Sequence, residues 1–317
     1  MLHTILGARG AIGNCLAREL INGRENVRLV SRTKFEVGPI NSFQADLLSL
    51  PDTIEALKGS EVAYLCVGLN YSTKVWQDDW PTIMYNVISA CKENNTKLIF
   101  FDNVYMYGKV EGKMTEETPY NPCSKKGEVR AKIARALETE MENGNIKALI
   151  ARSADLYGPY ISSNSIPFVM VFQQLLYGKK ADWIINANVP HSFTYTMDTA
   201  KSMYRLSQDD DNYGQVWHIP TCSPSLTGKE FVEIVATELN QSTKVTEIKK
   251  IFMWIGGFLN PIVKENLEMT YQYEYPYIFD SSKYENKYNR APTSYEQGIK
   301  DTITFIKKIA QAYHTFF

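Results

Sequence analysis

The stretch His3-Thr4-Ile5-Leu6-Gly7-Ala8-Arg9-Gly10-Ala11-Ile12-Gly13 decides the fold. An apolar run ends at the first glycine, two more glycines follow at three-residue intervals, and a helical pattern begins directly behind them. This order is typical of a dinucleotide site, because glycines let backbone N–H groups at a helix N-terminus approach a pyrophosphate closely. The G-x-x-G-x-x-G spacing is one residue wider than the G-x-G-x-x-G fingerprint. An ordinary strand–helix turn is the alternative, and a second apolar run at 27–30 favours the cofactor site.

Short apolar runs alternate with helical patterns through the first half of the chain. The sequence predicts strands at 4–6, 27–30, 42–45, 62–67, 98–102 and 148–152, with helices at 14–22, 50–58, 81–94 and 125–142. Beyond them it predicts helices at 168–177, 198–207, 228–239 and 295–312, and a strand at 215–219. The run 63–67 is apolar at successive positions, as in a parallel strand covered on both faces.

This alternation predicts an α/β fold with a Rossmann-type doubly wound parallel sheet. We expect a dinucleotide-binding domain at 1–155, with return segments near 190–220. The rest, 156–317, is expected to form mainly a smaller α+β domain that caps the carboxyl ends of the sheet and binds substrate.

The composition excludes several classes of protein. The 317 residues carry a formal net charge of −1 and are 44% hydrophobic, so the chain can bury a full core and nucleic acid is not expected as a partner. Five scattered cysteines favour a reducing compartment, and four dispersed histidines give no metal site. The longest apolar run, 251–259, is too short to span a bilayer. The first strand begins almost at once and leaves no room for a signal peptide, so we expect a cytoplasmic protein without a membrane partner.

The end of the second strand bears on the choice of cofactor. Ser31-Arg32-Thr33-Lys34 contains no acidic residue to accept from a ribose 2′-OH, whereas an arginine suits a 2′-phosphate. One charge-assisted hydrogen bond is worth about 1.5–3 kcal/mol, roughly tenfold to a hundredfold in preference. We therefore favour NADP over NAD, unless Arg32 is merely a solvated loop charge. The predicted cofactor-binding residues are Gly7, Arg9, Gly10, Ala11, Ile12, Gly13, Ser31, Arg32, Asp46, Leu47, Cys66, Val67 and Gly68.

Further motifs extend over nearly the whole chain. They include the three glycines, Asp46-Leu47, Asn86, Tyr107-Gly108, Arg152 with Tyr157-Gly158-Pro159, Phe193 to Ala200, and Asp280-Ser281-Ser282-Lys283 with Pro292-Thr293. Together they resemble the extended short-chain dehydrogenase/reductase superfamily, of the NAD(P)-dependent epimerase/dehydratase type. The resemblance implies the Rossmann fold, a small-molecule substrate, and a homodimer paired through helices 81–94 and 125–142.

The chain resembles an atypical member, because it lacks the usual Tyr-x-x-x-Lys. The family places a Ser or Thr shortly before the Tyr-Gly pair, and the tyrosine and lysine on the next helix; these positions fall on Asn103, Lys126 and Arg130. Asn103 can hydrogen-bond a substrate carbonyl, and Arg130 can hold ribose hydroxyls. Lys126, squeezed between Arg130 and an oxidised nicotinamide, would have its ammonium form disfavoured and could act as an acid.

Two alternatives stay open for these positions. Tyr105, Tyr107 or Tyr157 could supply the proton in place of Lys126. Otherwise Lys126 and Arg130 lie on a solvated helix face and catalyse nothing.

Two departures bear on the substrate. In sugar-nucleotide members of the family an arginine grips the diphosphate, and that position falls here on His191. An asparagine of the family is replaced by Asp155, which would repel a phosphate. A loop between Asn70 and Trp80 is expected to line a cleft with aromatic residues, which suits a flatter or less charged compound, although core packing is the alternative. The predicted substrate-binding residues are Asn70, Tyr71, Asp155, Tyr157 and His191.

Three functions are compatible with these residues. We favour an NADP-dependent oxidoreductase that transfers a hydride to or from a small carbonyl or alcohol. A nucleotide-sugar epimerase or dehydratase is the first alternative. A non-catalytic NADP-binding regulatory protein is the second.

Overall fold

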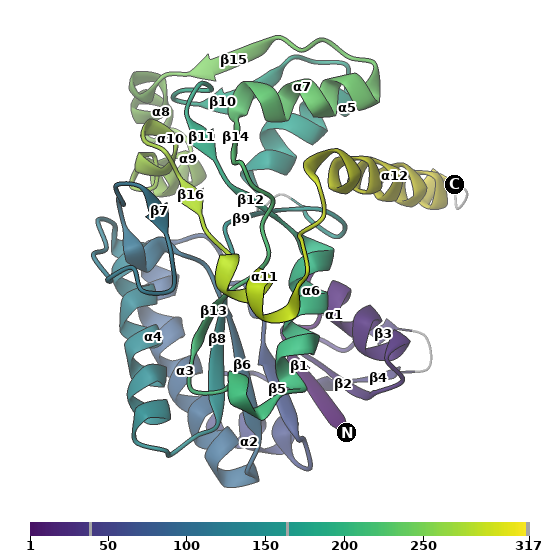
Figure 1. Ribbon diagram of the computed structural model, residues 1–317, viewed down its shortest axis with the longest axis vertical. Coiled ribbons are helices and arrows are strands. Elements are labelled where there is room, and N and C mark those ends of the chain that lie inside the picture. The colour runs from purple at the N-terminus through teal and green to yellow at the C-terminus, as the bar shows by residue number, and fades with distance from the viewer. Residues whose placement is uncertain (38–39, 163–164, 315–317) are drawn as a thin grey trace. The chain divides into compact units, whose positions relative to one another are not determined.

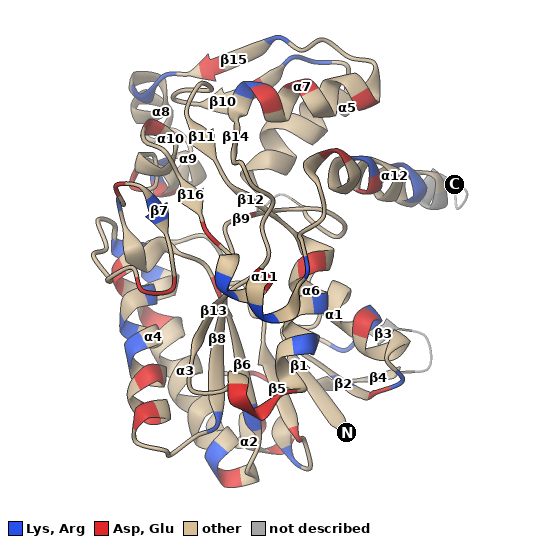
Figure 2. Ribbon diagram, viewed as in Figure 1, with Lys and Arg blue, Asp and Glu red and all other residues tan. Residues whose placement is uncertain are grey.

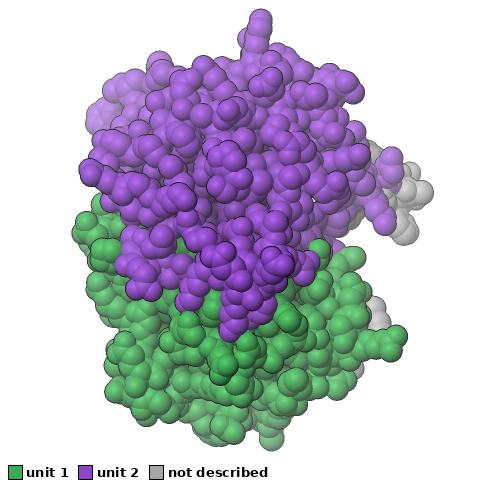
Figure 3. Space-filling model, in the orientation of Figure 1, with its two compact units in different colours: residues 1–108, 119–153, 199–219 green, residues 109–118, 154–198, 220–317 purple. Residues whose placement is uncertain are grey.

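The computed structural model describes residues 1–37, 40–162 and 165–314. The chain divides into two compact units, which Figure 3 colours separately. Unit 1 comprises Met1–Gly108, Pro119–Ser153 and Thr199–Ile219. Unit 2 comprises Lys109–Thr118, Ala154–Asp198 and Pro220–Phe317.

Unit 1 is built on a sheet with the strand order β13-β8-β6-β5-β1-β2-β4-β3 (Figure 1). Its strands are β1 (Leu2–Leu6), β2 (Asn26–Ser31), β3 (Glu36–Val37), β4 (Ile40–Gln44), β5 (Val62–Leu65), β6 (Lys97–Asp102), β8 (Ala148–Arg152) and β13 (Val216–His218). Seven strands are parallel and only β3, at the edge, pairs antiparallel. This confirms the predicted Rossmann-type sheet.

Helices cover both faces of this sheet, as the unbroken apolar runs predicted. Its helices are α1 (Ala11–Asn22), α2 (Leu50–Leu57), α3 (Thr73–Asn94), α4 (Lys125–Glu142) and the Thr199–Ser207 part of α6 (Thr196–Ser207), with 3₁₀ turns η1 (Tyr105–Tyr107) and η3 (Asp210–Asn212). Ala63 and Leu65 of β5 pack in one core cluster with α2, α3 and α4. Tyr64 between them points to the other face, where it stacks with His3, which in turn contacts Tyr204 of α6.

Helix α3 differs from the prediction at its start. The expected helix 81–94 begins eight residues earlier, at Thr73, and contains Pro81 in its interior. A proline removes one helical hydrogen bond and usually ends a helix. Here Trp76 and Trp80 are buried in the core of unit 1, so packing of the first two turns outweighs the lost bond. The expected loop up to Trp80 is therefore wrong from Thr73 onward, and both tryptophans are core residues.

Unit 2 consists of paired short strands and helices around its own apolar cluster. Its strands are β7 (Lys113–Met114), β9 (Asp155–Tyr157), β10 (Ala181–Ile184), β11 (Pro190–His191), β12 (Phe193–Tyr195), β14 (Leu226–Thr227), β15 (Val245–Ile248) and β16 (Ile278–Phe279). They pair as β10-β15, β11-β14, β12-β9 and β16-β7. Its helices are α5 (Gln173–Leu176), α7 (Gly228–Leu239), α8 (Lys250–Gly256), α9 (Pro261–Leu267), α10 (Tyr271–Glu274), α11 (Ser282–Tyr288) and α12 (Tyr295–His314), and a π-helix η2 (Phe168–Phe172) precedes α5.

The predictions for unit 2 succeed where local signals are strong. Helix α7 has the predicted bounds, because Thr227 and Glu230 form a reciprocal cap at its start. The predicted helix 168–177 is a π-helix followed by one short α-helix. The elements from β15 to α11 carry no clear periodicity in the sequence and were not predicted.

Charges of both signs are interspersed on helices such as α4 and α12 (Figure 2), in keeping with the near-neutral sequence. Within residues 1–37, 40–162 and 165–314, no helix combines the length and the apolar character needed to cross a bilayer. In the same described part of the chain, no three His, Cys, Asp or Glu residues are placed to hold a metal ion.

Candidate cofactor and active site

The glycine turn between β1 and α1 is closed by backbone-to-backbone contact. Gly7 has a φ of +93°, and a Cβ on it would lie 2.8 Å from the Val67 Cα. A Cβ on Gly13 would lie 2.6 Å from the Gly7 carbonyl oxygen and 2.7 Å from the Ala8 Cα. No larger residue fits either position without moving the backbone. The turn thus needs glycine at both ends for its own geometry.

The N-terminus of α1 is left open by this turn. Gly10 is its N-cap and supplies no side-chain hydrogen bond, and the first turn of the helix carries no acidic residue. The Gly10 N–H donates to the Gly7 carbonyl over 3.0 Å, which holds the turn tight. The first amides of an α-helix have no acceptor within the helix, so those of Ala11 and Ile12 are suited to an anion.

Cationic side chains gather beside the glycine turn at the end of β2. The Arg9 guanidinium donates to the Thr33 hydroxyl over 2.6 Å and lies 5.9 Å from the Phe35 ring centroid. Arg32 next to it is exposed, and the Ser31 hydroxyl donates to the Thr33 carbonyl. Arg9 of the glycine turn therefore contacts Thr33 and Phe35, which follow Arg32 in the chain after β2.

The loops after β4 and β5 complete the edge of the sheet. Asp46 is exposed and its carboxylate accepts from the Leu48 N–H over 3.1 Å. Leu47 is buried, and its carbonyl accepts from the Asn86 amide of α3 over 2.8 Å. Burial raises the pKa of the Cys66 thiol well above its usual range, so this thiol is unreactive. Gly68 is exposed and has open space around it.

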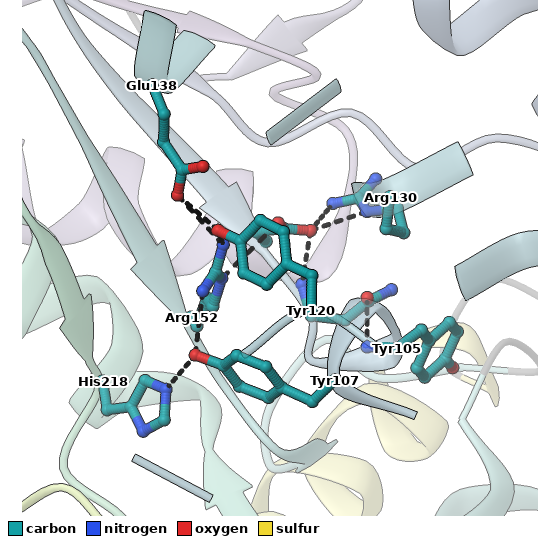
Figure 4. A network of polar contacts seen from close by, with 9 residues as sticks. Tyr105, Tyr107, Tyr120, Arg130, Glu138, Arg152 and His218 are labelled. Atoms are coloured by element: carbon teal, nitrogen blue, oxygen red, sulfur yellow. Dashed lines mark hydrogen bonds and ion pairs between the residues drawn. The ribbon is translucent and has the colours of Figure 1, made fainter. Parts of the chain in front are cut away.

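Asp102, the last residue of β6, holds a buried ion pair (Figure 4). Its Oδ1 accepts from the Arg130 Nε over 2.6 Å and also contacts the Arg130 Nη2. The same oxygen accepts from the Asn103 N–H over 2.8 Å. The Arg130 guanidinium carbon lies 4.4 Å from the Trp80 ring centroid, so the arginine sits in an aromatic enclosure. Arg130 is therefore held inside the unit, with its charge balanced by Asp102.

Arg152 of β8 extends this network toward a second set of polar groups (Figure 4). Its Nη1 donates to the Tyr107 hydroxyl over 2.8 Å, and that hydroxyl lies 2.9 Å from the His218 Nε2. Its Nη2 donates to the Tyr120 hydroxyl. Burial alone would lower the pKa of Arg152, but Tyr107, Tyr120 and Asp102 outweigh it and raise the value. This network ties β6, β8, β13 and α4 together.

Lys126 lies one turn before Arg130 on α4 and is also buried, with no exposed surface. Its Nζ donates to the Thr73 hydroxyl over 3.0 Å and lies 4.6 Å from the centroid of the Tyr71 ring. The alternative that Lys126 and Arg130 lie on a solvated face is therefore wrong.

Asn103 and Tyr105 lie on the turn after β6. The Asn103 Oδ1 accepts from the Tyr105 N–H over 3.1 Å, which fixes its amide at the end of the strand. Tyr105 is half-buried and its ring stacks on Trp76 with 6.2 Å between centroids. Asn70 is exposed, and its carbonyl accepts from the Trp76 Nε1 over 3.1 Å.

Two of the predicted substrate residues of unit 2, Asp155 and His191, contact each other. The His191 Nε2 lies 3.0 Å from the Asp155 Oδ2, and the Tyr273 hydroxyl donates to the same oxygen over 3.1 Å. The His191 Nδ1 on the other side of the ring lies 3.2 Å from the Gln272 carbonyl oxygen. Tyr157 lies in the core of unit 2, where burial raises the pKa of its hydroxyl.

Sequence reasoning missed Asp102 and Thr73. Asp102 ends an apolar strand directly before Asn103, which is a usable signal, since an acid at a buried strand end needs a cationic partner. Thr73 carried no signal, because the helix it begins was expected to start later.

The comparisons with known proteins point to one family. An uncharacterized UDP-glucose epimerase of Bacillus subtilis (strain 168) is 23% identical over 228 residues, which cover 63% of this chain and 70% of that protein. A dTDP-glucose 4,6-dehydratase from Bacillus anthracis strain Ames, solved in complex with NAD, aligns with a TM-score of 0.81 and 16% identity, covering 98% of both chains.

A second solved structure has the same fold. A UDP-glucuronic acid 4-epimerase from Bacillus cereus, solved with NAD, has a TM-score of 0.79 and 17% identity, covering 98% of this chain and 99% of that one. The family model described as "NAD dependent epimerase/dehydratase family" matches residues 3–219. This confirms the epimerase/dehydratase resemblance drawn from the motifs: the chain belongs to the NAD-dependent epimerase/dehydratase family.

Proposed function

We propose that this protein is an NAD(P)-dependent enzyme of the epimerase/dehydratase type, acting at a hydroxyl-bearing carbon of a sugar derivative. The observation that carries the proposal is the open N-terminus of α1 behind the glycine turn. Its amides and helix dipole suit the diphosphate of a dinucleotide. The similar proteins support the substrate class, since they are named for UDP-glucose, UDP-glucuronic acid and dTDP-glucose.

The phosphorylated cofactor, NADP, is the preferred one in this proposal. The turn after β2 offers Arg32, and the Arg9 contact to Thr33 adds a second guanidinium on the same side of the turn. An arginine can hold a 2′-phosphate through two parallel hydrogen bonds. Residues 31–35 contain no carboxylate that would accept from a free 2′-OH.

When bound, the nicotinamide ring supplies or accepts a hydride. Asn103 orients the substrate oxygen by donating from its amide, and Lys126 stores the proton that this oxygen gains or loses. Arg130 has a positioning role, because Asp102 and three aromatic rings already hold its guanidinium. It keeps α4, and with it Lys126, in place against β6.

A small carbonyl compound is the second candidate substrate, and Asp155 favours it. This carboxylate already accepts from His191 and Tyr273, so it offers negative charge to a ligand of unit 2. A diphosphate would be repelled there, whereas a hydroxyl or amine could donate to the second carboxylate oxygen.

The test is a titration followed by a substrate panel. The full chain is titrated with NADPH, NADH, NADP and NAD, and then incubated with nucleotide sugars, free sugars and small carbonyl compounds. We expect dinucleotide binding and turnover of one substrate class. In the Lys126→Met variant kcat should fall by about 10² to 10⁴ with unchanged dinucleotide affinity, while Lys125→Met, at the exposed neighbour, should behave as wild type. Tight dinucleotide binding without turnover of any compound would contradict the enzymatic proposal and favour a regulatory protein.

A further inference from the structure

The proposed function gives no role to Thr73, the first residue of α3. Its hydroxyl oxygen is 3.0 Å from the Lys126 Nζ. Lys126 has no exposed surface, whereas Thr73 is partly exposed. The threonine hydroxyl therefore connects a buried ammonium group with the surface of unit 1.

The chemistry of the two groups fixes the direction of this hydrogen bond. An ammonium has three donors and no acceptor, so the Thr73 oxygen accepts and its own hydrogen points away from Nζ. The centroid of the Tyr71 ring lies 4.6 Å from Nζ, which is a cation–π contact. In this arrangement the Thr73 hydroxyl can donate its proton and receive another one from the Lys126 ammonium group.

We propose that Thr73 is a proton-relay residue between Lys126 and the substrate oxygen. This inference rests on the proposed function. In the reducing direction the Thr73 O–H bond breaks and its proton goes to the substrate carbonyl oxygen. One N–H bond of Lys126 breaks and its proton goes to the Thr73 oxygen, which leaves a neutral amine. After the product leaves, a solvent proton passes to the partly exposed Thr73 hydroxyl while the Thr73 proton passes to the Lys126 amine. One solvent proton is thus consumed for each carbonyl reduced, and the oxidising direction reverses every transfer.

Neighbouring groups are less suited to this role. Asn103 has no titratable proton, and its Oδ1 already accepts from the Tyr105 N–H. Arg130 stays protonated and is held by Asp102. Lys126 itself is enclosed, so a relay lets it act without leaving its buried position.

Three variants of α3 test the relay. Thr73→Val removes the hydroxyl at nearly constant volume, Thr73→Ser keeps it, and Thr82→Val makes the same change at an exposed position of the same helix. We expect kcat to fall about a hundredfold in Thr73→Val, with unchanged KM for the dinucleotide, near-complete recovery in Thr73→Ser and no effect in Thr82→Val. Wild-type kcat in Thr73→Val, or equal loss in the valine and serine variants, would overturn the relay while leaving the proposed function standing.

A second measurement needs no turnover. Nuclear magnetic resonance of protein with ¹⁵N-labelled lysine follows the Lys126 Nζ signal in the unliganded protein. Because the Thr73 hydroxyl lies 3.0 Å from Nζ, this signal should shift in Thr73→Val and stay in place in Thr82→Val, and an unchanged signal in Thr73→Val would contradict the contact. If the wild type binds dinucleotide but turns over nothing, the proposed function fails and the relay fails with it, whereas the Nζ signal still reports the contact itself.

Discussion

The glycine turn and the first turn of α4 both begin a helix of unit 1, but they are shaped by different forces. At the glycine turn, backbone atoms exclude larger residues: a Cβ added to Gly13 would lie 2.6 Å from the Gly7 carbonyl oxygen. At α4 the Ser124 hydroxyl caps the helix by accepting from the Gly127 N–H. There the chemistry is set by side chains that come from β6 and α3, namely Asp102 and Thr73.

This difference explains how far each region can be interpreted from a sequence. Where backbone atoms exclude larger residues, the sequence shows one residue type at a fixed spacing, as it does for glycine at a closed turn. A contact between side chains that are distant in the sequence produces no such regular spacing. The family's tyrosine and lysine positions could be located by motif, but the partners of Lys126 and Arg130 only appear in the folded chain.

The largest effect is expected at the backbone-limited region. In Gly13→Ala the new Cβ meets only backbone atoms, so the turn must open and dinucleotide binding should not be detected at millimolar concentrations. Calorimetric titration with NADPH measures it. Gly256→Ala is the control, since its Cβ would lie 3.6 Å from a Val263 methyl, an ordinary contact. Should Gly13→Ala fail to fold, Gly10→Ala, with 3.3 Å to the nearest oxygen, should weaken binding instead; full affinity in both would break the comparison.

The side-chain region should respond in stability. Asp102→Asn leaves Arg130 and Arg152 buried without their carboxylate, which should lower the free energy of unfolding by about 3–5 kcal/mol. Urea unfolding followed by circular dichroism measures this change. The control is Asp78→Asn, whose pair with Lys74 is exposed, so its loss should leave the stability almost unchanged. Equal stability of the two variants would show that the buried pair does not hold α4.

A smaller effect is expected in cofactor choice. Arg32→Ala should weaken NADPH binding by about tenfold, because one charge-assisted hydrogen bond to the 2′-phosphate is lost. NADH affinity should not change, and Arg18→Ala, an exposed position on α1, should change neither. Parallel titrations of both dinucleotides give the ratio. An equal loss for NADH and NADPH would remove the argument for the phosphorylated cofactor.

The smallest effect concerns pH and the beginning of β1. Burial lowers the pKa of His3 below 6.5, against the opposing attraction of Glu25. A histidine that is neutral when folded and protonated when unfolded contributes stability above pH 6.5, and this is lost as the pH falls toward its folded value. Unfolding free energies between pH 7.5 and 5.5 should therefore fall in the wild type with a slope of at most about 1.4 kcal/mol per pH unit from this group. His3→Gln should show a shallower slope; an identical slope would assign the effect to other groups.

Much of unit 1 was predictable because its signals are local. The glycine spacing and the unbroken apolar strands sufficed for the sheet, and the helix at Lys125–Glu142 has the predicted bounds. The start of α3 was not predictable, since Pro81 is a stronger local signal than the burial of Trp76 and Trp80 that overrides it. The sequence predicts that Arg130 holds ribose hydroxyls, because nothing near it in sequence reveals its ion pair with Asp102. The contact of Asp155 with His191 links positions 36 residues apart and likewise needed the fold.

The most direct test of the account is a crystal structure of the full chain with NADPH. The account predicts the diphosphate within about 3 Å of the Ala11 and Ile12 amides, with the 2′-phosphate against the Arg9 and Arg32 guanidinium groups. A dinucleotide bound elsewhere, or side chains filling the space before α1 so that none binds, would contradict it.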